Sequence, residues 1–342
     1  MYEANTIIKD LRVLTEHFIP RRIIHRTGQL EALRDNLKPL VNEEIPRSSF
    51  LYGPPGTGKT CMSQYIVDEL KAHATVLSSY VNCWSYPSRF KILFNILQSL
   101  GHNFINRKGT PTDELIDTLK NKIKNRPCII VLDEADQLED EKILYDLLDI
   151  EKVCIILIAN TENLFATIDP RIRSRLQSID RIEFRAYSTR EIFDILKDRA
   201  DLGLVNDAIS TEQITKIADA SGGDARIALN ILRIAAEEAE KRDAEKILDS
   251  HIERAAPKTK NLESDRLLES LNTHQKILYG IVKSCKEISS SDLHEKYISV
   301  CKEKNIEPIV DRTVRKYLEK LEAFKLVSSS GDGRWTVYKI SS

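Results

Sequence analysis

Hydrophobic residues recur along the chain in two kinds of pattern, one mixed and one helical throughout. The change from one pattern to the other divides the chain into regions. Between Ser48 and Arg185, short apolar runs alternate with longer segments in which apolar residues recur at helical spacing. Strands separated by helices predict an α/β fold, with a parallel sheet covered by helices on both faces. The predicted strands are Ser49–Tyr52, Thr75–Asn82, Cys128–Leu132, Val153–Ala159 and Ile179–Phe184.

After residue 187 the pattern becomes helical throughout and stays so to about residue 256. Ser188 and Glu191 have the spacing of a capping box, which predicts the start of the first helix of this region. The stretch 257–271 has one proline, many charges and no strong periodicity, so we expect a linker there.

Composition narrows the choice of function class without deciding it. The chain has 342 residues, is 42% hydrophobic and 30% charged, and carries a formal net charge of −1. That length suits two or three domains, and a net charge near zero means that any nucleic-acid site must be a local patch. The apolar runs are too short to span a bilayer and the N-terminus lacks a signal-peptide core, so we expect a cytoplasmic protein without a membrane partner. The cysteines lack metal-binding spacing and predict reduced, mostly buried thiols: Cys61, Cys83, Cys128, Cys154, Cys285 and Cys301.

A glycine-rich loop follows the first predicted strand. Its sequence fits the phosphate-binding pattern GxxxxGK[ST]: Gly53-Pro54-Pro55-Gly56-Thr57-Gly58-Lys59-Thr60. Glycines let backbone N–H groups turn toward phosphate oxygens, and the helix N-terminus that follows adds its positive dipole end. We expect Lys59 to reach the β- and γ-phosphates of ATP or ADP, Thr60 to ligate Mg²⁺, and Cys61 to line the same pocket. The alternative, a glycine-rich turn with an incidental lysine, fits the strand–loop–helix context less well.

Two carboxylates end the third predicted strand. The apolar run Ile129–Leu132 is followed by Asp133, expected to hold Mg²⁺ through water, and Glu134, expected to orient or deprotonate the attacking water. Alone, a strand ending in solvated acids would be the simpler interpretation, but the loop upstream favours a nucleotide site. Asn160 ends the next strand, where its amide would lie beside the γ-phosphate and hold the attacking water.

At this point the motifs resemble one family. The segments Gly53–Thr60, Val131–Asp136, Ile158–Asn163 and Ile168–Leu176 follow one another as in AAA+ ATPases. Residues 221–229, Ser-Gly-Gly-Asp-Ala-Arg-Ile-Ala-Leu, resemble the second sensor of the initiator and clamp-loader branch. The resemblance covers nearly the whole chain and is strongest to the archaeal single-polypeptide initiator and helicase-loader type.

The resemblance implies a fold, a domain division and a function. It implies an AAA+ base with a five-stranded parallel sheet over 1–187, a helical lid over 188–256, a linker over 257–271 and a winged helix over 272–342. It implies an ATP-dependent replication initiator that binds origin duplex DNA on the chromosome, with slow ATP hydrolysis as a switch for helicase loading. A paralogous initiator subunit and the replicative helicase are the implied protein partners.

The resemblance also implies roles for residues outside the two motifs. Arg226 matches the second sensor, which reaches the γ-phosphate from the lid. Arg175 matches the arginine finger that completes a neighbour's site, with Arg171 and Arg173 as rivals; a solvated basic loop is the alternative. Departures from the family pattern are Thr27, where an acid is usual, and Arg175 itself, which many archaeal relatives lack. The resemblance implies an adenine pocket formed by the segment 15–30 and by a residue after the last strand. Its implied residues are Ile19, Pro20, Ile23 and His25 from the segment, and Tyr187 after the strand. For the four residues of the segment, packing of the N-terminal segment on the core is the alternative.

The C-terminal region predicts a DNA-binding surface. Three helical segments follow from Thr273, and Val327–Ile340 is typical of a hairpin. On the third helix, one face is predicted to be apolar (Val310, Val314, Tyr317, Leu318, Leu321), and the region 309–342 has seven basic residues against four acids. A recognition helix with a wing would suit this pattern, whereas a solvated face or a protein contact is the alternative. The candidate DNA contacts are Arg312, Thr313, Arg315, Lys316, Arg334 and Trp335.

A second DNA surface would lie between the second strand and the paired carboxylates, where the resemblance implies a helical insertion. Its candidates are Arg89, Arg107 and Lys108, with a packing helix and a polar loop as the equal alternative. Two other functions also stay open. A clamp-loader small subunit shares the ATPase core but ends in a helical collar rather than a hairpin, and a winged-helix signalling ATPase that regulates transcription usually continues into repeats or sensor domains.

Overall fold

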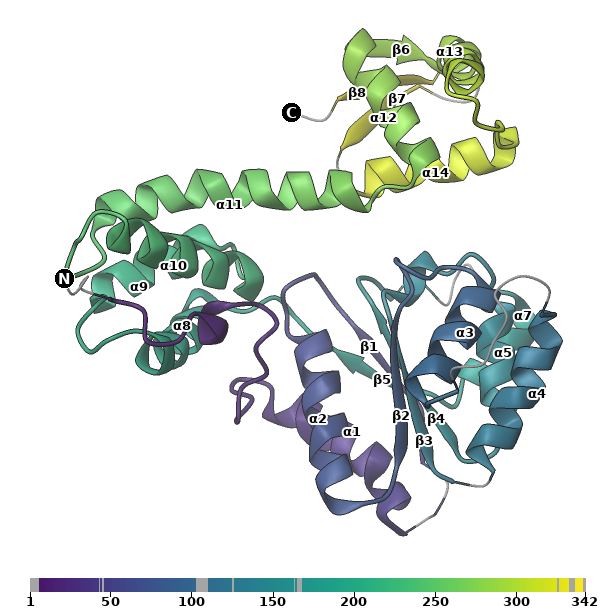
Figure 1. Ribbon diagram of the computed structural model, residues 1–342, viewed down its shortest axis with the longest axis horizontal. Coiled ribbons are helices and arrows are strands. Elements are labelled where there is room, and N and C mark those ends of the chain that lie inside the picture. Colours follow the sequence, from purple (N-terminus) through teal and green to yellow (C-terminus); the bar gives the residue numbers. More distant parts are fainter. Residues whose placement is uncertain are drawn as a thin grey trace. The chain divides into compact units, whose positions relative to one another are not determined.

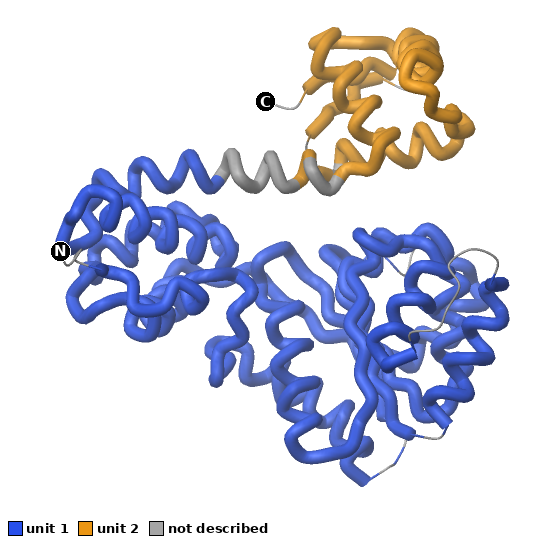
Figure 2. The backbone as a smooth tube through the Cα atoms, viewed as in Figure 1, with its two compact units in different colours: residues 1–259 blue, residues 260–342 orange. Residues whose placement is uncertain are grey.

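The computed structural model describes residues 6–42, 44, 46–102, 110–124, 126–162, 164, 168–324, 326–331 and 336–340. The chain forms two compact units, Met1–Thr259 and Lys260–Ser342, drawn in different colours in Figure 2. The first unit contains the sheet and a helical region, and the second contains the C-terminal helices and hairpin.

The sheet of the first unit is parallel and has the strand order β2-β3-β4-β1-β5. Its buried central strands have the near-continuous apolar sequences that such a sheet needs, and the predicted strands are confirmed to within two residues at each end. In the register of β2 and β3, Tyr80 lies opposite Val131 and Asn82 opposite Asp133. The strands are β1 Ser49–Tyr52, β2 Leu77–Asn82, β3 Cys128–Asp133, β4 Val153–Ala159 and β5 Asp180–Glu183.

Helices cover both faces of this sheet, as the sequence predicts. Figure 1 shows α1 and α2 on one side and α3, α4, α5 and α7 on the other. Each side has its own buried cluster, one around Met62 and Ile66, the other around Leu93 and Leu119. The helices are α1 Thr27–Leu37, α2 Lys59–His73, α3 Arg89–Ser99, α4 Thr112–Ile123, α5 Lys142–Leu148 and α7 Pro170–Leu176, with short 3₁₀ helices at Leu11–Leu14, Lys38–Asn42 and Ala135–Gln137.

The helical region after the sheet comprises α8 Thr189–Gly203, α9 Thr211–Ala220 and α10 Ala225–Glu240. The predicted capping box is present, with the Ser188 hydroxyl accepting from the Glu191 N–H and the Glu191 carboxylate accepting from the Ser188 N–H. The first described residues pack here rather than against the sheet, although the resemblance implies that 1–187 belong to the base. Ile7 and Leu14 lie in the core of this helical region, and Ile8 forms a β-bridge with Leu204.

The predicted linker is helical. Helix α11, Asp249–Ser270, runs through it with Pro257 in its interior, and the boundary between the two compact units falls within this helix. Its first half is held to the preceding helices, since Ala255 is fully buried and Lys258 Nζ lies 2.7 Å from Glu238 Oε1. Packing and polar contacts there offset the loss of helix stability that an interior proline causes.

After α11, the described residues of the second unit form three helices and a three-stranded antiparallel sheet of order β6-β8-β7. The predicted hairpin is confirmed as β7 and β8, whereas the three-residue β6 was not predicted because it is too short to show a period. Buried Leu278, Tyr297 and Leu318 lie in its core. Its elements are α12 Thr273–Cys285, β6 Glu287–Ser289, α13 Ser290–Glu303, α14 Asp311–Ala323, β7 Val327–Ser330 and β8 Val337–Ile340.

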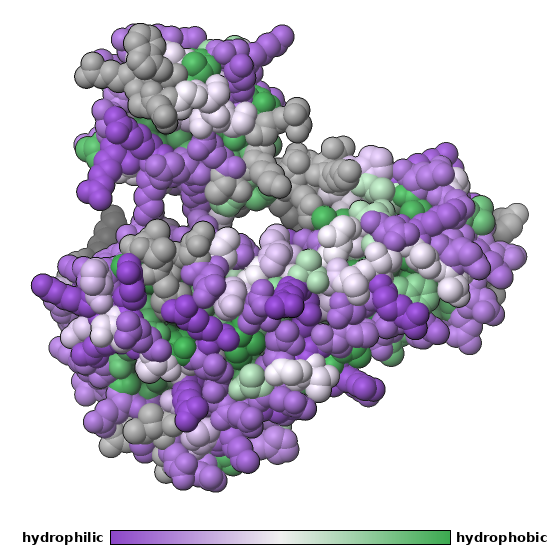
Figure 3. Space-filling view, turned by 180° about the vertical axis from the view of Figure 1, so that it is seen from behind, coloured by the Kyte–Doolittle hydropathy of each residue, from purple (hydrophilic) through white to green (hydrophobic). Residues whose placement is uncertain are grey.

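The face drawn in Figure 3 is mostly hydrophilic, and the cysteines are free thiols, as their spacing predicts. On the face drawn in Figure 3, hydrophilic residues predominate and hydrophobic ones form small separate groups. Within the described part of the chain, none of the helices combines the length and apolarity that a membrane crossing requires. All six cysteines are free thiols, four of them buried and two, Cys61 and Cys285, partly exposed.

Candidate functional site

The glycine-rich loop between β1 and α2 has a backbone that requires glycine. Gly56 and Gly58 have φ angles of 70° and 92°, in the left-handed region that other residues rarely adopt. There is also no room for side chains. A Cβ at Gly56 would lie 1.8 Å from Asp224 Oδ1, and one at Gly58 would lie 2.9 Å from the Tyr187 hydroxyl oxygen. The loop is therefore closely covered by residues that follow the sheet in sequence.

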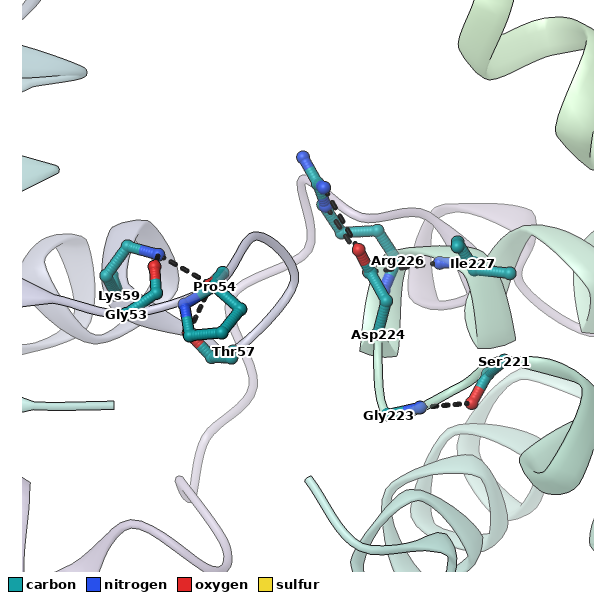
Figure 4. Close-up of polar contacts among 9 residues, drawn as sticks. All are labelled: Gly53, Pro54, Thr57, Lys59, Ser221, Gly223, Asp224, Arg226 and Ile227. Carbon is teal, nitrogen blue, oxygen red and sulfur yellow. Dashed lines mark hydrogen bonds and ion pairs between the residues drawn. The ribbon is translucent and has the colours of Figure 1, made fainter. Parts of the chain in front are cut away.

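Lys59, the first residue of α2, is buried under this loop. Its ammonium donates to the backbone carbonyls of Gly53, at 2.6 Å, and Pro54, at 2.8 Å; Figure 4 shows the side chain turned back over its own loop. Burial lowers the pKa of Lys59 to about 8, although the charge of Asp133 opposes that shift. Phosphate oxygens would supply the negative charge that this desolvated ammonium lacks.

The carboxylate of Asp133, at the end of β3, accepts hydrogen bonds from two hydroxyl groups. Its Oδ2 accepts from Thr60 Oγ1 at 2.7 Å and from the Tyr80 hydroxyl at 2.6 Å, and its Oδ1 accepts from the Glu134 N–H at 2.9 Å. Burial and the Asp133 charge raise the pKa of the Tyr80 phenol, which keeps it a donor. Glu134 has a φ of 54°, an uncommon conformation outside glycine that is frequent at functional sites.

Most of the predicted nucleotide residues surround one cavity of about 220 Å³ in the first unit. It is bounded by the loop and by the carboxyl ends of β3 and β4, where Glu134 and Asn160 lie together. Gly53 and Pro54 contribute through their contacts with Lys59 rather than to the wall. The lining residues from the sheet region are Pro55, Gly56, Thr57, Gly58, Lys59, Thr60, Cys61, Asp133, Glu134 and Asn160; those after it are Tyr187, Ile195, Asp198, Arg199, Ala225, Arg226 and Leu229.

Arg226 reaches the cavity from the first turn of α10. Asp224 caps this helix, accepting from the N–H groups of Arg226 and Ile227, and its carboxylate also pairs with the Arg226 guanidinium at 3.0 Å (Figure 4). The Ala225 N–H donates to the carbonyl of Gly56 at 3.1 Å. The start of α10 is thus joined directly to the phosphate-binding loop, which places Arg226 within the wall.

The N-terminal segment forms the remaining wall, though only in part with the predicted residues. Pro20 and Ile23 line the cavity, together with Glu16, Arg22 and Ile24, which sequence reasoning missed. Ile19 and His25 are not among the lining residues. His25 instead points to α8, with Nε2 2.9 Å from Asp194 Oδ2, so it ties the segment to the helical region rather than facing the cavity.

Two buried arginines hold this segment in place. Arg26 donates to the Thr57 and Arg185 carbonyls and stacks over the Tyr187 ring, 3.9 Å from its centroid. Arg199 of α8 donates to the carbonyls of Val13 and Phe18, both at 3.1 Å. Arg199 gave no sequence signal, because its role depends on a contact almost 190 residues away in sequence.

The three candidate finger arginines lie on α7, outside the cavity wall. Arg175 stacks over the Tyr145 ring at 4.1 Å and pairs with Asp149 at 3.0 Å. Arg173 donates to the Ile168 carbonyl at 3.0 Å, and Arg171 is exposed. A role in a neighbouring protomer's site therefore stays a prediction, and Arg175 would first have to leave Tyr145.

Helix α14 presents its basic residues to solvent. Arg312, Arg315 and Lys316 are exposed and Thr313 is half-buried, while the apolar stripe of Val314, Leu318 and Leu321 is buried as predicted. Val310 departs from that stripe, since it is the residue before the helix and its exposed fraction is 71%. Arg334 and Trp335 lie outside the described residues.

The predicted second DNA surface is represented by Arg89 alone, because Arg107 and Lys108 lie outside the described residues. Arg89 begins α3, and its guanidinium pairs with Asp146 at 2.6 Å and Asp113 at 3.2 Å. Its side chain is only 20% exposed. These contacts favour the packing alternative for Arg89, because the acids already neutralise its charge.

Comparisons with known proteins agree along the chain. Family models match at 44–167, an AAA domain; at 193–257, the Cdc6 AAA+ ATPase-type lid domain; and at 266–341, the CDC6 C-terminal winged helix domain. ORC1-type DNA replication protein 9 of Halobacterium salinarum is 38% identical, over 99% of this chain and 95% of its own.

Solved structures are similar in fold. The Aeropyrum pernix ORC1 protein, in complex with DNA, has a TM-score of 0.81 at 24% identity, covering 98% of this chain and 94% of that one. The A. pernix ORC2 protein, in ADPNP-ADP complexes, has a TM-score of 0.68 at 24% identity and the same coverage.

These matches decide between the open alternatives. A clamp-loader small subunit and a winged-helix signalling ATPase would share the phosphate-binding loop, but neither accounts for a Cdc6-type lid and a CDC6 winged helix in one chain. The AAA+ base, lid and C-terminal winged helix predicted from the sequence are all present. The chain belongs to the ORC1-type family of DNA replication proteins, which are AAA+ ATPases.

Proposed function

We propose that this protein is a DNA replication initiator that binds origin duplex DNA through α14 and uses ATP as a switch. The observation that carries the proposal is the outward face of α14, where Arg312, Arg315 and Lys316 are exposed opposite a buried apolar stripe. A helix with this arrangement can enter a major groove while its other face stays in the domain core. The solved complex of a similarly folded ORC1 protein with DNA supports it.

ATP or ADP would occupy the 220 Å³ cavity, with its phosphates at the glycine-rich loop. Lys59 would then exchange its backbone acceptors for phosphate oxygens, and the base would lie against Pro20, Ile23 and Tyr187. The loop's N–H groups and the N-terminus of α2 favour the same anionic group.

The residues at the cavity also fit Mg²⁺. The Thr60 hydroxyl, which donates to Asp133 Oδ2 at 2.7 Å, and the Asp133 carboxylate supply hard oxygen donors of the kind that Mg²⁺ prefers. Within the described residues, no cluster of three or more His, Cys, Asp or Glu side chains could hold a metal. The ion would be held by one carboxylate, one hydroxyl and the nucleotide's own phosphates, where it would offset their charge.

Hydrolysis would depend on Glu134 as the base for the attacking water and Asn160 as its second partner. Arg226 would reach the γ-phosphate only by leaving Asp224, which now holds its guanidinium. That exchange would couple the start of α10 to the presence of the γ-phosphate. We therefore expect slow turnover, suited to a timing switch rather than a motor.

The finer parts of the role follow from the family. We propose that the protein acts in the cytoplasm on chromosomal DNA, and that its ATP state controls loading of the replicative helicase. A paralogous initiator subunit would be the partner at the AAA+ surface, where Arg175, Arg171 or Arg173 would complete a neighbour's site.

The direct test is selection of genomic DNA by the full-length protein. Fragments from the source genome are incubated with ATP and Mg²⁺, retained, washed at rising salt and sequenced. Enrichment of replication-origin fragments is expected, and it should disappear for Arg312→Ala/Arg315→Ala. Uniform recovery of fragments, or enrichment of clustered transcription control regions away from any origin, would contradict the initiator role.

A further inference from the structure

Tyr80 makes a contact that the two sequence motifs do not account for. Its hydroxyl lies 2.6 Å from Asp133 Oδ2, the same oxygen that accepts from Thr60 at 2.7 Å. Tyr80 belongs to β2, the edge strand next to β3, and its partner in the register is Val131. Because side chains of residues two apart share a face, Tyr80 stands on the same face as Asp133 and reaches it by leaning along the strand.

From this geometry we propose that Tyr80 is a positioning residue for Asp133, the magnesium ligand. The inference rests on the proposed binding of Mg²⁺ with ATP. A carboxylate oxygen has about two lone-pair sites, so the two hydroxyls fill those of Oδ2. Oδ1 accepts only the Glu134 N–H among the described contacts, at 2.9 Å. Tyr80 therefore fixes the rotation of the carboxylate and leaves Oδ1 as the oxygen with acceptor capacity for the ion or its water.

Packing does not explain the placement of Tyr80. Its exposed fraction is 40%, and it lies outside the buried cluster formed by Val131 and α2 on that face of the sheet. A phenylalanine would fill the same space without the hydroxyl. The part of Tyr80 that is specifically placed is its oxygen, which meets a buried carboxylate. Partners that orient a metal ligand typically affect metal affinity by about 10–100-fold.

Tyr80→Phe removes that hydroxyl and nothing else. The affinity of the full-length protein for a fluorescent ADP is measured across a Mg²⁺ series and again in EDTA, and Mn²⁺ bound to the ADP complex is titrated by electron paramagnetic resonance. The apparent affinity for the metal should fall about tenfold, while nucleotide affinity in EDTA and the thermal midpoint of the nucleotide-free protein stay as in the parent. Tyr86→Phe, at an equally exposed tyrosine beyond β2, is the matched control and should change neither.

Asp133→Asn separates this inference from the proposal on which it rests. If Asp133→Asn abolishes the metal dependence but Tyr80→Phe stays within twofold of the parent, the role of Tyr80 is wrong and the magnesium site stands. If Asp133→Asn leaves the metal dependence unchanged, the magnesium site itself is wrong. An equal loss of affinity with and without metal in Tyr80→Phe would make Tyr80 a structural residue only.

Discussion

The nucleotide cavity and the exposed face of α14 both offer basic side chains to an anionic ligand, but they are built in opposite ways. In the cavity a single lysine, Lys59, is 6% exposed, and its ammonium is fixed by two backbone carbonyls under a loop of positive-φ glycines. On α14 the basic side chains Arg312, Arg315 and Lys316 are exposed, and no ion pair holds them among the described residues. The cavity is preorganised, whereas the helix offers independent charges.

This difference predicts how each region responds to substitution. In the cavity, one carboxylate takes part in several interactions. Asp133 accepts hydrogen bonds from Thr60 and Tyr80, and Asp224 both pairs with Arg226 and caps α10. Effects there should be large and not additive. On α14 each basic side chain should bind DNA independently, so that every substitution has a moderate and nearly additive cost.

The largest effect is expected for Glu134→Gln, which keeps the size of the side chain but removes the proposed base. ATP hydrolysis should fall by about 10²–10⁴-fold, the usual contribution of general-base catalysis. ATP affinity should stay within about twofold, because the loop and Lys59 are unchanged. Single-turnover phosphate release and nucleotide titration measure the two quantities. Undiminished hydrolysis would remove Glu134 from the mechanism.

Lys59→Ala should weaken the binding of both ATP and ADP by about 100-fold, since the substitution removes a charge-assisted hydrogen bond from a desolvated site. Titration with a fluorescent nucleotide measures this. Lys71→Ala is the matched control, because Lys71 is an exposed lysine in the last turn of the same helix. Equal dissociation constants for Lys59→Ala and the parent would contradict the assignment of the phosphate site.

The lowered pKa of Lys59 predicts a pH dependence of nucleotide binding. The pKa is about 8 without nucleotide, and phosphate should raise it, so the bound form holds the proton more tightly. Affinity is then at its full value below pH 8 and falls as pH rises above 8, by up to about tenfold per pH unit. Calorimetry at pH 9 in two buffers of different ionisation enthalpy should show proton uptake on binding. Affinity that stays constant to pH 9.5 would contradict the burial argument.

Features that depend on neighbouring residues could be predicted from the sequence, whereas contacts between distant residues could not. The strands, the phosphate-binding loop and the Ser188 capping box follow from neighbouring residues, and the structure has them. The Tyr80–Asp133 contact needs the register of β2 and β3, across 53 positions of sequence. The His25–Asp194 pair likewise joins two segments whose proximity no local pattern encodes.

The extents of two helices, α11 and α14, likewise could not be predicted from local sequence. The boundary between the two units falls within the predicted linker 257–271, but its helical structure has no sequence signal because Pro257 interrupts the period; Ala255 and Lys258 hold the first half of α11 to the preceding helices. Val310 fits the helical stripe in sequence but precedes the helix, where it is exposed. In both cases the deciding information is where the helix begins or ends, which depends on packing.

The most direct test of DNA recognition by α14 is duplex binding by Arg312→Ala/Arg315→Ala across a salt series. Affinity for origin DNA should fall by more than about tenfold, since each base contact contributes about 1–3 kcal/mol. The slope of log affinity against log salt should shrink by about 0.9 for each phosphate that the variant no longer neutralises, with ATP affinity unchanged. Lys302→Ala/Lys304→Ala removes the same charge from exposed positions at the end of α13 and should have a much smaller effect. Unchanged affinity and slope in the α14 variant, or equal losses in both variants, would contradict DNA recognition by this helix.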